Sequence, residues 1–103
     1  MAQKTVAGQS IEVNDEGYMT DASQWTKEIA AELAKEDGIA LTDKHYEVLE
    51  FLRETIEKGN TLTIRRVGKS GIIDIKGLYG LFPGGPLKLS SKYAGIPKPA
   101  SCI

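Results

Sequence analysis

Apolar side chains recur at helical spacing early in the chain. Positions i, i+4 and i+8 of one stripe are occupied by Trp25, Ile29 and Leu33. Asp21 or Ser23 can cap the start of this helix, and Asp21 followed by Gln24 has capping-box spacing. The Asp37-Gly38 pair is typical of a helix end. These positions predict an amphipathic helix that ends near residue 37.

A second, longer stripe follows on Tyr46, Leu49, Leu52 and Ile56. Thr42 and Asp43 are residue types that begin helices, and Gly59 is one that ends them. Val48 and Phe51 widen the apolar face. The pattern predicts the longest helix of the chain between residues 43 and 58.

The pattern is different before the first helix, where residues 10–13 alternate between polar and apolar types. Residues 14–17 (NDEG) favour a turn, and Tyr18 and Met19 follow as apolar partners. The sequence therefore predicts a small N-terminal β-hairpin. Two strands alone are only marginally stable, so the hairpin must pack against the helices.

The sequence pattern of the last third of the chain predicts three short helices. Thr61 or Thr63 can cap the first, Asp74 can cap the second, and Pro86 suits the first position of the third. The first two, separated by a glycine turn, have the outline of a helix-turn-helix. The predicted fold is α+β and mainly α: a hairpin packed on a bundle of about five helices.

Residues 94–103 (AGIPKPASCI) favour an extended arm. Gly95 ends the last helix, and Pro97 and Pro99 cannot resume it because proline lacks a backbone donor. At about 3.3 Å per residue, such an arm could carry Cys102 about 25 Å from its anchor. We expect one domain over residues 1–103, with residues 94–103 as a mobile C-terminal arm.

Composition and charge narrow the class of protein. The chain has 103 residues, 41% hydrophobic and 26% charged, which is typical of one globular domain rather than a disordered chain. Its net charge of −1 is unevenly distributed. Residues 1–60 hold six basic and thirteen acidic side chains, whereas residues 61–103 hold seven basic side chains and only Asp74 as an acid.

Cys102 is the one cysteine, so no internal disulfide can form, and a reducing cytoplasm is the expected location. A cysteine enzyme needs a base beside its nucleophile, and His45 is more plausible as a cap or packing residue. A metal site needs three or four ligands, which one cysteine and one distant histidine do not supply. We therefore expect neither a metal nor another cofactor.

Two kinds of partner suit the basic half of the chain. Arg65, Arg66, Lys69 and Lys76 could contact nucleic-acid phosphates through the predicted helix-turn-helix. Equally, they could attract an anionic protein or an anionic sulfur species to the thiol. The residues alone leave both alternatives open, with nucleic acid as the secondary one.

Several motifs together resemble the DsrC/TusE family of sulfur-relay proteins. The C-terminal residues 94–103 match the family's signature nearly position for position, and residues 81–86 (LFPGGP) precede it. Further matches fall in the family's order along the chain: residues 16–18 (EGY), 23–25 (SQW), 38–42 (GIALT) leading to His45, and 51–53 (FLR).

This resemblance implies a mainly helical fold with a hairpin and a C-terminal arm, and the carriage of sulfane sulfur as a persulfide on Cys102. It implies a transferase-type carrier without its own general base, loaded by a sulfurtransferase complex and unloaded by a tRNA thiolase or a sulfite-reductase-like enzyme. Basic residues would dock the partner or hold the anionic persulfide; our candidates are Arg65, Arg66, Lys92 and Lys98.

One departure from the family's pattern separates its branches. Members that work with dissimilatory sulfite reductase carry a second cysteine eleven residues before the last, where this chain has Ser91. A hydroxyl cannot attack a persulfide to close a disulfide, so the chain looks more like the single-cysteine, TusE-like branch. The alternatives are a partner subunit related to the gamma subunit of dissimilatory sulfite reductase and a helix-turn-helix DNA-binding regulator.

Overall fold

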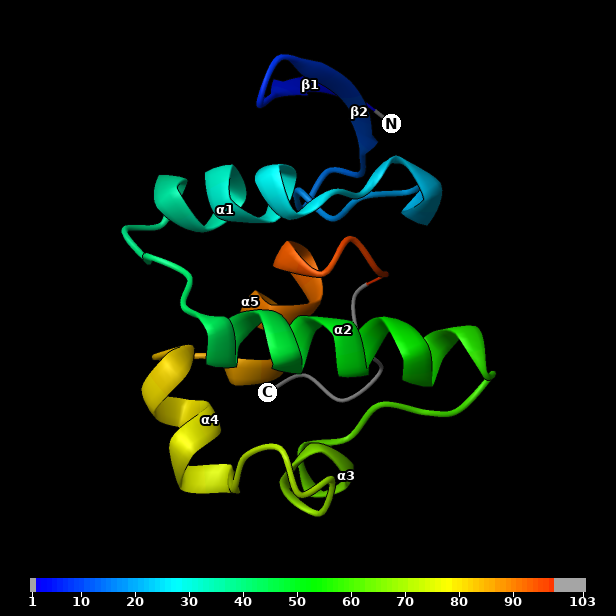
Figure 1. The fold of residues 1–103 in the computed structure, drawn as a ribbon. Helices are drawn as coiled ribbons and strands as arrows, with labels where there is room; N and C mark the ends of the chain where they lie inside the picture. Colours follow the sequence, from blue (N-terminus) through cyan, green and yellow to red (C-terminus); the bar gives the residue numbers. More distant parts are fainter. Residues whose placement is uncertain (1, 98–103) are drawn as a thin grey trace.

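A computed structural model describes residues 2–97 of the chain. Its elements are two strands, one short 3₁₀ helix and five α-helices: β1 (Ala2–Val6), β2 (Gln9–Val13), η1 (Ala22–Gln24), α1 (Lys27–Glu36), α2 (Asp43–Glu57), α3 (Ile64–Gly68), α4 (Ile75–Leu81) and α5 (Pro86–Tyr93). The hairpin lies on the outer side of α1, α5 lies between α1 and α2, and α3 and α4 form the opposite end (Figure 1). The α+β, mainly helical fold is confirmed.

The N-terminal hairpin is confirmed, with the predicted strand at residues 10–13 inside β2 and a turn at residues 14–17, but the main partner of β2 is a strand that was not predicted. β2 pairs with β1, from Ala2 opposite Val13 to Val6 opposite Gln9. The turn between these two strands is Ala7-Gly8, and both residues have positive φ, 51° and 77°. A turn with two positive φ angles usually carries Asn-Gly or Asp-Gly, so an alanine there gave no sequence signal. The predicted partner, Met19, makes only a single bridge to Val13.

The predicted start of the first long helix was also wrong. α1 begins at Lys27, after Thr26, whose Oγ1 accepts a hydrogen bond from the Ile29 amide at 3.2 Å. Asp21 instead caps the separate helix η1. Gln24 does not complete a capping box, because its side-chain oxygen accepts a bond from the Glu12 amide at 2.9 Å. A contact between distant segments thus displaced the locally expected one.

The starts of the later helices follow local chemistry as predicted. Thr63 Oγ1 accepts from the Arg66 amide at 3.0 Å, and Asp74 accepts from the Gly77 amide. Pro86 is the first residue of α5, where its missing N–H costs nothing. Each cap satisfies a backbone group that the helix itself leaves unpaired.

His45 is a structural residue, as predicted. The Thr42 amide donates to its Nδ1 at 3.0 Å, so Nε2 carries the proton and donates to the Leu81 carbonyl at 3.0 Å. The buried ring also packs edge-on against Phe82 at 5.1 Å. Both ring nitrogens are therefore used in joining the start of α2 to the end of α4.

The apolar stripes predicted on the helices pack around α5 to form the core. Four helices supply most of its fully buried side chains, among them Ile29, Leu33, Val48, Leu49, Leu52, Leu78, Leu87 and Tyr93, and Ile11 of β2 joins them. The prediction that Ile56 faces inward was wrong, because its side chain is 38% exposed. The C-terminal end of α2 extends past α5 (Figure 1).

The predicted arm over residues 94–103 is described only as far as Pro97. Ala94 and Ile96 are 0% and 2% exposed and belong to the core, so the chain is anchored through Ile96. Mobility of residues 98–103 remains a prediction outside the described residues. In the described part, no helix has the length and apolarity needed to cross a membrane.

Replacing His45 with alanine should lower the free energy of unfolding by about 2 kcal/mol, because the Thr42 amide and the buried Leu81 carbonyl would both lose their partner. Urea unfolding measures this loss. Glu32→Ala, on an exposed face of α1, is the control and should change stability by less than about 0.5 kcal/mol. Equal effects of the two substitutions would show that His45 is not part of the framework.

Candidate functional site

The end of α5 fixes where the cysteine-bearing segment leaves the body. Gly95 has a φ of +71°, its amide donates to the Lys92 carbonyl, and the Ile96 amide donates to the Ser91 carbonyl at 3.2 Å. These two bonds form a Schellman motif, which terminates a helix through a left-handed residue. The chain therefore turns sharply at Gly95 and leaves α5 in one direction.

Trp25 covers this turn. Its indole Nε1 donates to the Tyr93 carbonyl at 2.7 Å. A Cβ at Gly95 would lie 2.6 Å from Trp25 Cδ1 and 2.9 Å from its Cβ and Cγ. Glycine is thus required at position 95 for two reasons, the left-handed backbone and the indole packed against it.

Arg53 joins the turn to α2 and to η1. Its Nη1 donates to the Ala94 carbonyl at 2.8 Å, its Nη2 donates to the Ala22 carbonyl at 3.0 Å, and its guanidinium lies 4.4 Å from the Trp25 ring centroid. Burial lowers the pKa of Arg53, and nearby Glu57 opposes that shift. A cation at the C-terminal end of α5 is favourable, because unpaired carbonyls gather there. Below, Trp25, Arg53 and Gly95 are called the exit clamp.

A pocket of about 330 Å³ opens beside the exit clamp, lined by Ala22, Ser23, Arg53, Ile56, Glu57 and Ile96. It accounts for the exposure of Ile56, whose apolar side chain forms part of the wall. The segment after Ile96 therefore begins next to a cavity with both apolar and charged walls.

Tyr93 fastens the same helix to α1. Its hydroxyl donates to Asp37 Oδ2 at 2.7 Å, and burial, reinforced by that carboxylate, raises the pKa of the Tyr93 phenol far above its usual value. Lys92 Nζ lies 3.5 Å from the same carboxylate oxygen. The predicted docking residue Lys92 is thus already paired with Asp37.

Arg65 and Arg66 lie together, as predicted. Both are exposed on α3 and line a pocket of about 470 Å³ with Phe51, Thr63, Lys69 and Ser70. Lys92 does not line this pocket. Cys102 and Lys98 fall outside the described residues. That Arg65, Arg66, Lys92 and Lys98 lie around Cys102 remains a prediction.

Ser91 is fully buried in α5. Its Oγ is the one buried side-chain polar atom without a hydrogen-bond partner among residues 2–97. The neighbouring Ser90 is buried too, but its Oγ donates to the Pro86 carbonyl. Burying the hydroxyl of Ser91 therefore costs desolvation free energy that no hydrogen bond offsets.

Comparison with known proteins places this arrangement in a family. A family model described as "DsrC like protein" matches residues 5–103, which includes the exit clamp and the cysteine-bearing end. The chain belongs to the DsrC-like family. Its relatives named "Sulfurtransferase TusE" include those of Photorhabdus laumondii subsp. laumondii, 41% identical over 93% of this chain and 94% of that protein, and Escherichia coli K12, 38% identical over 93% and 95%.

Solved structures of the DsrC-like family agree in fold. The NMR structure of Allochromatium vinosum DsrC superposes with a TM-score of 0.81 at 34% identity, covering 98% of this chain and 97% of that one. The oxidized gamma-subunit of the dissimilatory sulfite reductase (DsrC) from Archaeoglobus fulgidus gives a TM-score of 0.80 at 29% identity, covering 99% and 100%.

Sequence reasoning did not identify the exit clamp. Trp25 was assigned to a helical stripe, Arg53 appeared only within a family motif, and Gly95 was interpreted as a helix end. The one available signal was a glycine after a helix, which indicates a left-handed residue but not what packs on it. Trp25 and Gly95 are 70 residues apart in the chain, so only the folded structure brings them into contact.

Gly95→Ala tests the exit clamp against a matched glycine. Gly38 ends α1 with φ +78° and has nothing within 4 Å of a Cβ, so Gly38→Ala should cost about 1 kcal/mol for the backbone alone. Gly95→Ala should cost about 3 kcal/mol, because the methyl group also collides with Trp25. Urea unfolding compares the two. Equal losses would contradict close packing of the indole on Gly95.

Ser91→Ala should leave stability unchanged or raise it by about 1 kcal/mol, because a buried hydroxyl without a partner is removed. Ser90→Ala, on the same helix, should lose about 1 kcal/mol along with the bond to Pro86. The two substitutions have the same helix propensity, so the difference between their unfolding free energies isolates the hydrogen bond. A loss at position 91 as large as that at position 90 would mean that Ser91 has a partner.

Proposed function

We propose that this protein is a sulfur carrier: it accepts a sulfane sulfur as a persulfide on Cys102 and passes it to a downstream enzyme. The observation that carries this proposal is the family match through residue 103 together with relatives named as sulfurtransferases over nearly their whole length. The cysteine-bearing end therefore lies inside the region of similarity.

The chemistry requires only one thiol. The Cys102 thiolate attacks the outer sulfur of a persulfide on the donor, a new S–S bond forms on Cys102, and the donor's S–S bond breaks. The electron pair of the broken bond leaves with the donor thiolate. A nucleophile of the acceptor then attacks the outer sulfur on Cys102 and releases the Cys102 thiolate. Neither step changes the overall oxidation level, so no redox cofactor is needed.

The exit clamp supports this role by holding the point from which the cysteine-bearing end leaves the body. Cys102 is six residues beyond Ile96, so covalent geometry limits their Cα separation to about 20 Å. Arg53 holds the Ala94 carbonyl by a hydrogen bond of 2.8 Å, and Trp25 holds the Tyr93 carbonyl by one of 2.7 Å. A fixed origin and a bounded reach would let one thiol visit two partner enzymes in turn.

The proposed partners are a sulfurtransferase donor complex and a sulfur-accepting enzyme, either a tRNA thiolase or a sulfite-reductase-like protein. Arg65, Arg66, Lys92 and Lys98 are the proposed contacts with these partners or with the anionic persulfide. With Cys102 as its one cysteine, the chain can hold sulfur at a single site and cannot close an internal disulfide. We place the protein in a reducing cytoplasm for the same reason.

A second candidate is a partner subunit of a sulfite-reductase-like complex, which the likeness to the Archaeoglobus fulgidus gamma-subunit favours. Such a subunit would bind its enzyme equally well when Cys102 is replaced. A carrier would still bind but would transfer no sulfur. A DNA-binding role through α3 and α4 would instead require duplex binding that weakens steeply with salt.

Incubation with a persulfide-loaded sulfurtransferase should increase the mass of the intact protein by about 32 Da, the mass of one sulfur, at Cys102. Cys102→Ser should abolish the increase, while Ser101→Ala, the neighbouring control, should retain it. Mass spectrometry of the intact chain, with and without a reductant, measures both. A reductant-sensitive increase that persists in Cys102→Ser would refute the carrier role.

A further inference from the structure

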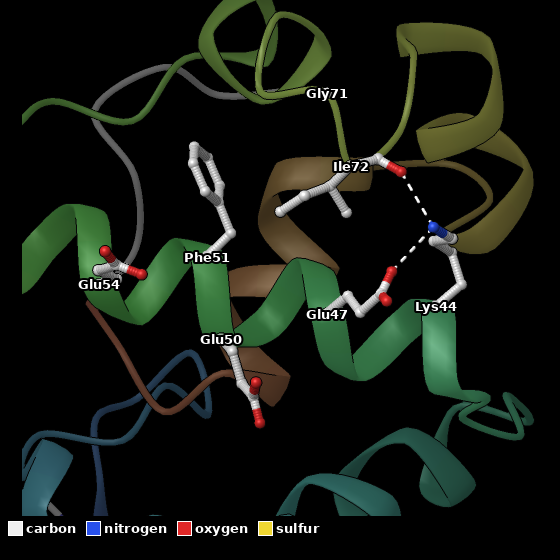
Figure 2. A pocket seen from close by; sticks show the side chains of 7 residues that line it. All are labelled: Lys44, Glu47, Glu50, Phe51, Glu54, Gly71 and Ile72. Atoms are coloured by element: carbon white, nitrogen blue, oxygen red, sulfur yellow. Dashed lines mark hydrogen bonds and ion pairs between the residues drawn. The ribbon is translucent and has the colours of Figure 1, made fainter.

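Two pockets that share Phe51 in their linings lie between α2 and residues 63–72, and together they are called the groove below. The first, of about 470 Å³, is lined by Lys44, Glu47, Glu50, Phe51, Glu54, Gly71 and Ile72. The second is the pocket of Arg65 and Arg66 described above, and Phe51 lines both. Figure 2 shows the Phe51 side chain rising from α2 toward Gly71, with the Ile72 side chain extending toward it from the opposite wall.

The two ends of the groove carry opposite charges. Arg65, Arg66 and Lys69 surround the α3 end, and none of them forms an ion pair with any residue from 2 to 97. The α2 end is lined by Glu47, Glu50 and Glu54 together with Lys44, and Figure 2 shows Glu50 pointing away from Phe51 and Ile72.

The glutamates at the α2 end remain available to a ligand. Each pairs with a lysine, at 2.8, 3.5 and 2.8 Å respectively, and all of these side chains are about half exposed or more. Exposed pairs of this kind contribute little and can be replaced by a ligand's charge.

The middle of the groove is apolar. Phe51 and Ile72 are both half-buried and pack against the core from its edge. Lys44 crosses the far end, where its Nζ donates to the Ile72 carbonyl at 3.1 Å and pairs with Glu47 (Figure 2). That bridge joins α2 to the opposite wall and so keeps the groove from widening.

This charge order selects among occupants. A nucleic acid lying along the groove would carry phosphates past three glutamates, which repel them. A protein segment can instead place an acidic side chain at one end and a basic one at the other. The apolar middle suits one large side chain between them, as in interfaces that centre on an aromatic or aliphatic anchor.

We propose that the groove between α2 and the α3–α4 segment binds a segment of a partner protein with a defined charge order. The segment places an acidic group against Arg65, Arg66 and Lys69, a large apolar side chain against Phe51 and Ile72, and a basic group against Glu47. The partner's identity as a sulfur donor or acceptor rests on the proposed function; the recognition itself does not.

The test uses the full chain and two labelled peptides. One has two acidic residues at one end, Leu-Phe in the middle and two basic residues at the other; the second has the same residues with the charges alternating. Fluorescence anisotropy gives the affinities, and amide NMR shifts locate the site. The ordered peptide should bind at least about tenfold more tightly and shift the amides of Phe51, Lys69 and Gly71.

Matched variants separate the groove from general charge attraction. Replacing Arg65 and Arg66 with glutamate should weaken the ordered peptide by about tenfold or more. Lys88→Glu, an exposed cation on α5 that lines neither pocket, should change the affinity by less than about twofold. Equal affinities for the two peptides, or shifts that map elsewhere, would overturn the proposal.

Other occupants would also be recognised. If a single-stranded RNA oligonucleotide bound at the same amides more tightly than the ordered peptide, the occupant would be a nucleic acid. Shifts of those amides on removal of residues 98–103, without peptide, would make the chain's own end the occupant, and shifts that depend on protein concentration would indicate a second copy. Each of these outcomes overturns the proposal.

The peptide experiment does not involve sulfur, so its result is separate from that for the carrier. Cys102→Ser should bind the ordered peptide as the unsubstituted chain does. Peptide binding without any persulfide on Cys102 would refute the carrier and leave the groove standing. Persulfide formation on Cys102 without peptide binding would refute the groove and support the carrier.

Discussion

The structure depends on how the C-terminal end of α5 is closed. A helix end leaves carbonyl groups unpaired, and here Trp25 and Arg53 donate to two of them while Gly95 turns the chain away. Because α5 lies between α1 and α2, this one closure also sets the spacing of the bundle (Figure 1). Three segments far apart in sequence meet at a point where only glycine fits.

A rigid origin for the cysteine-bearing end explains why so much of a small domain is devoted to anchoring. Ala94 and Ile96 are buried although they follow the last helix, and Tyr93 is tied to Asp37. A carrier gains from this arrangement, because a fixed origin limits the volume that its thiol explores and raises its effective concentration at a docked partner. The single histidine, held by Thr42 and Leu81, serves the framework instead of the chemistry.

The near-zero net charge conceals two opposed surfaces that meet at Phe51. The exposed face of α2 is rich in glutamate, and α3 supplies arginines that form no ion pair within the described part of the chain. Such segregation costs little in folding, since exposed charges interact weakly, but it discriminates strongly between partners. Ser91 is a buried hydroxyl without a hydrogen-bond partner in the described part of the chain, so its desolvation is tolerated without compensation.

Local chemistry was sufficient for the helices from α2 onward, because Thr63, Asp74 and Pro86 act on backbone groups within a few residues of themselves. The motifs around Cys102 were sufficient for the family. The tertiary structure decided the rest: the strand paired with β2, the start of α1, the exposure of Ile56 and the exit clamp. In the clamp the partners are 28 to 70 residues apart, and a side chain's local sequence does not contain the contacts that it makes across such separations.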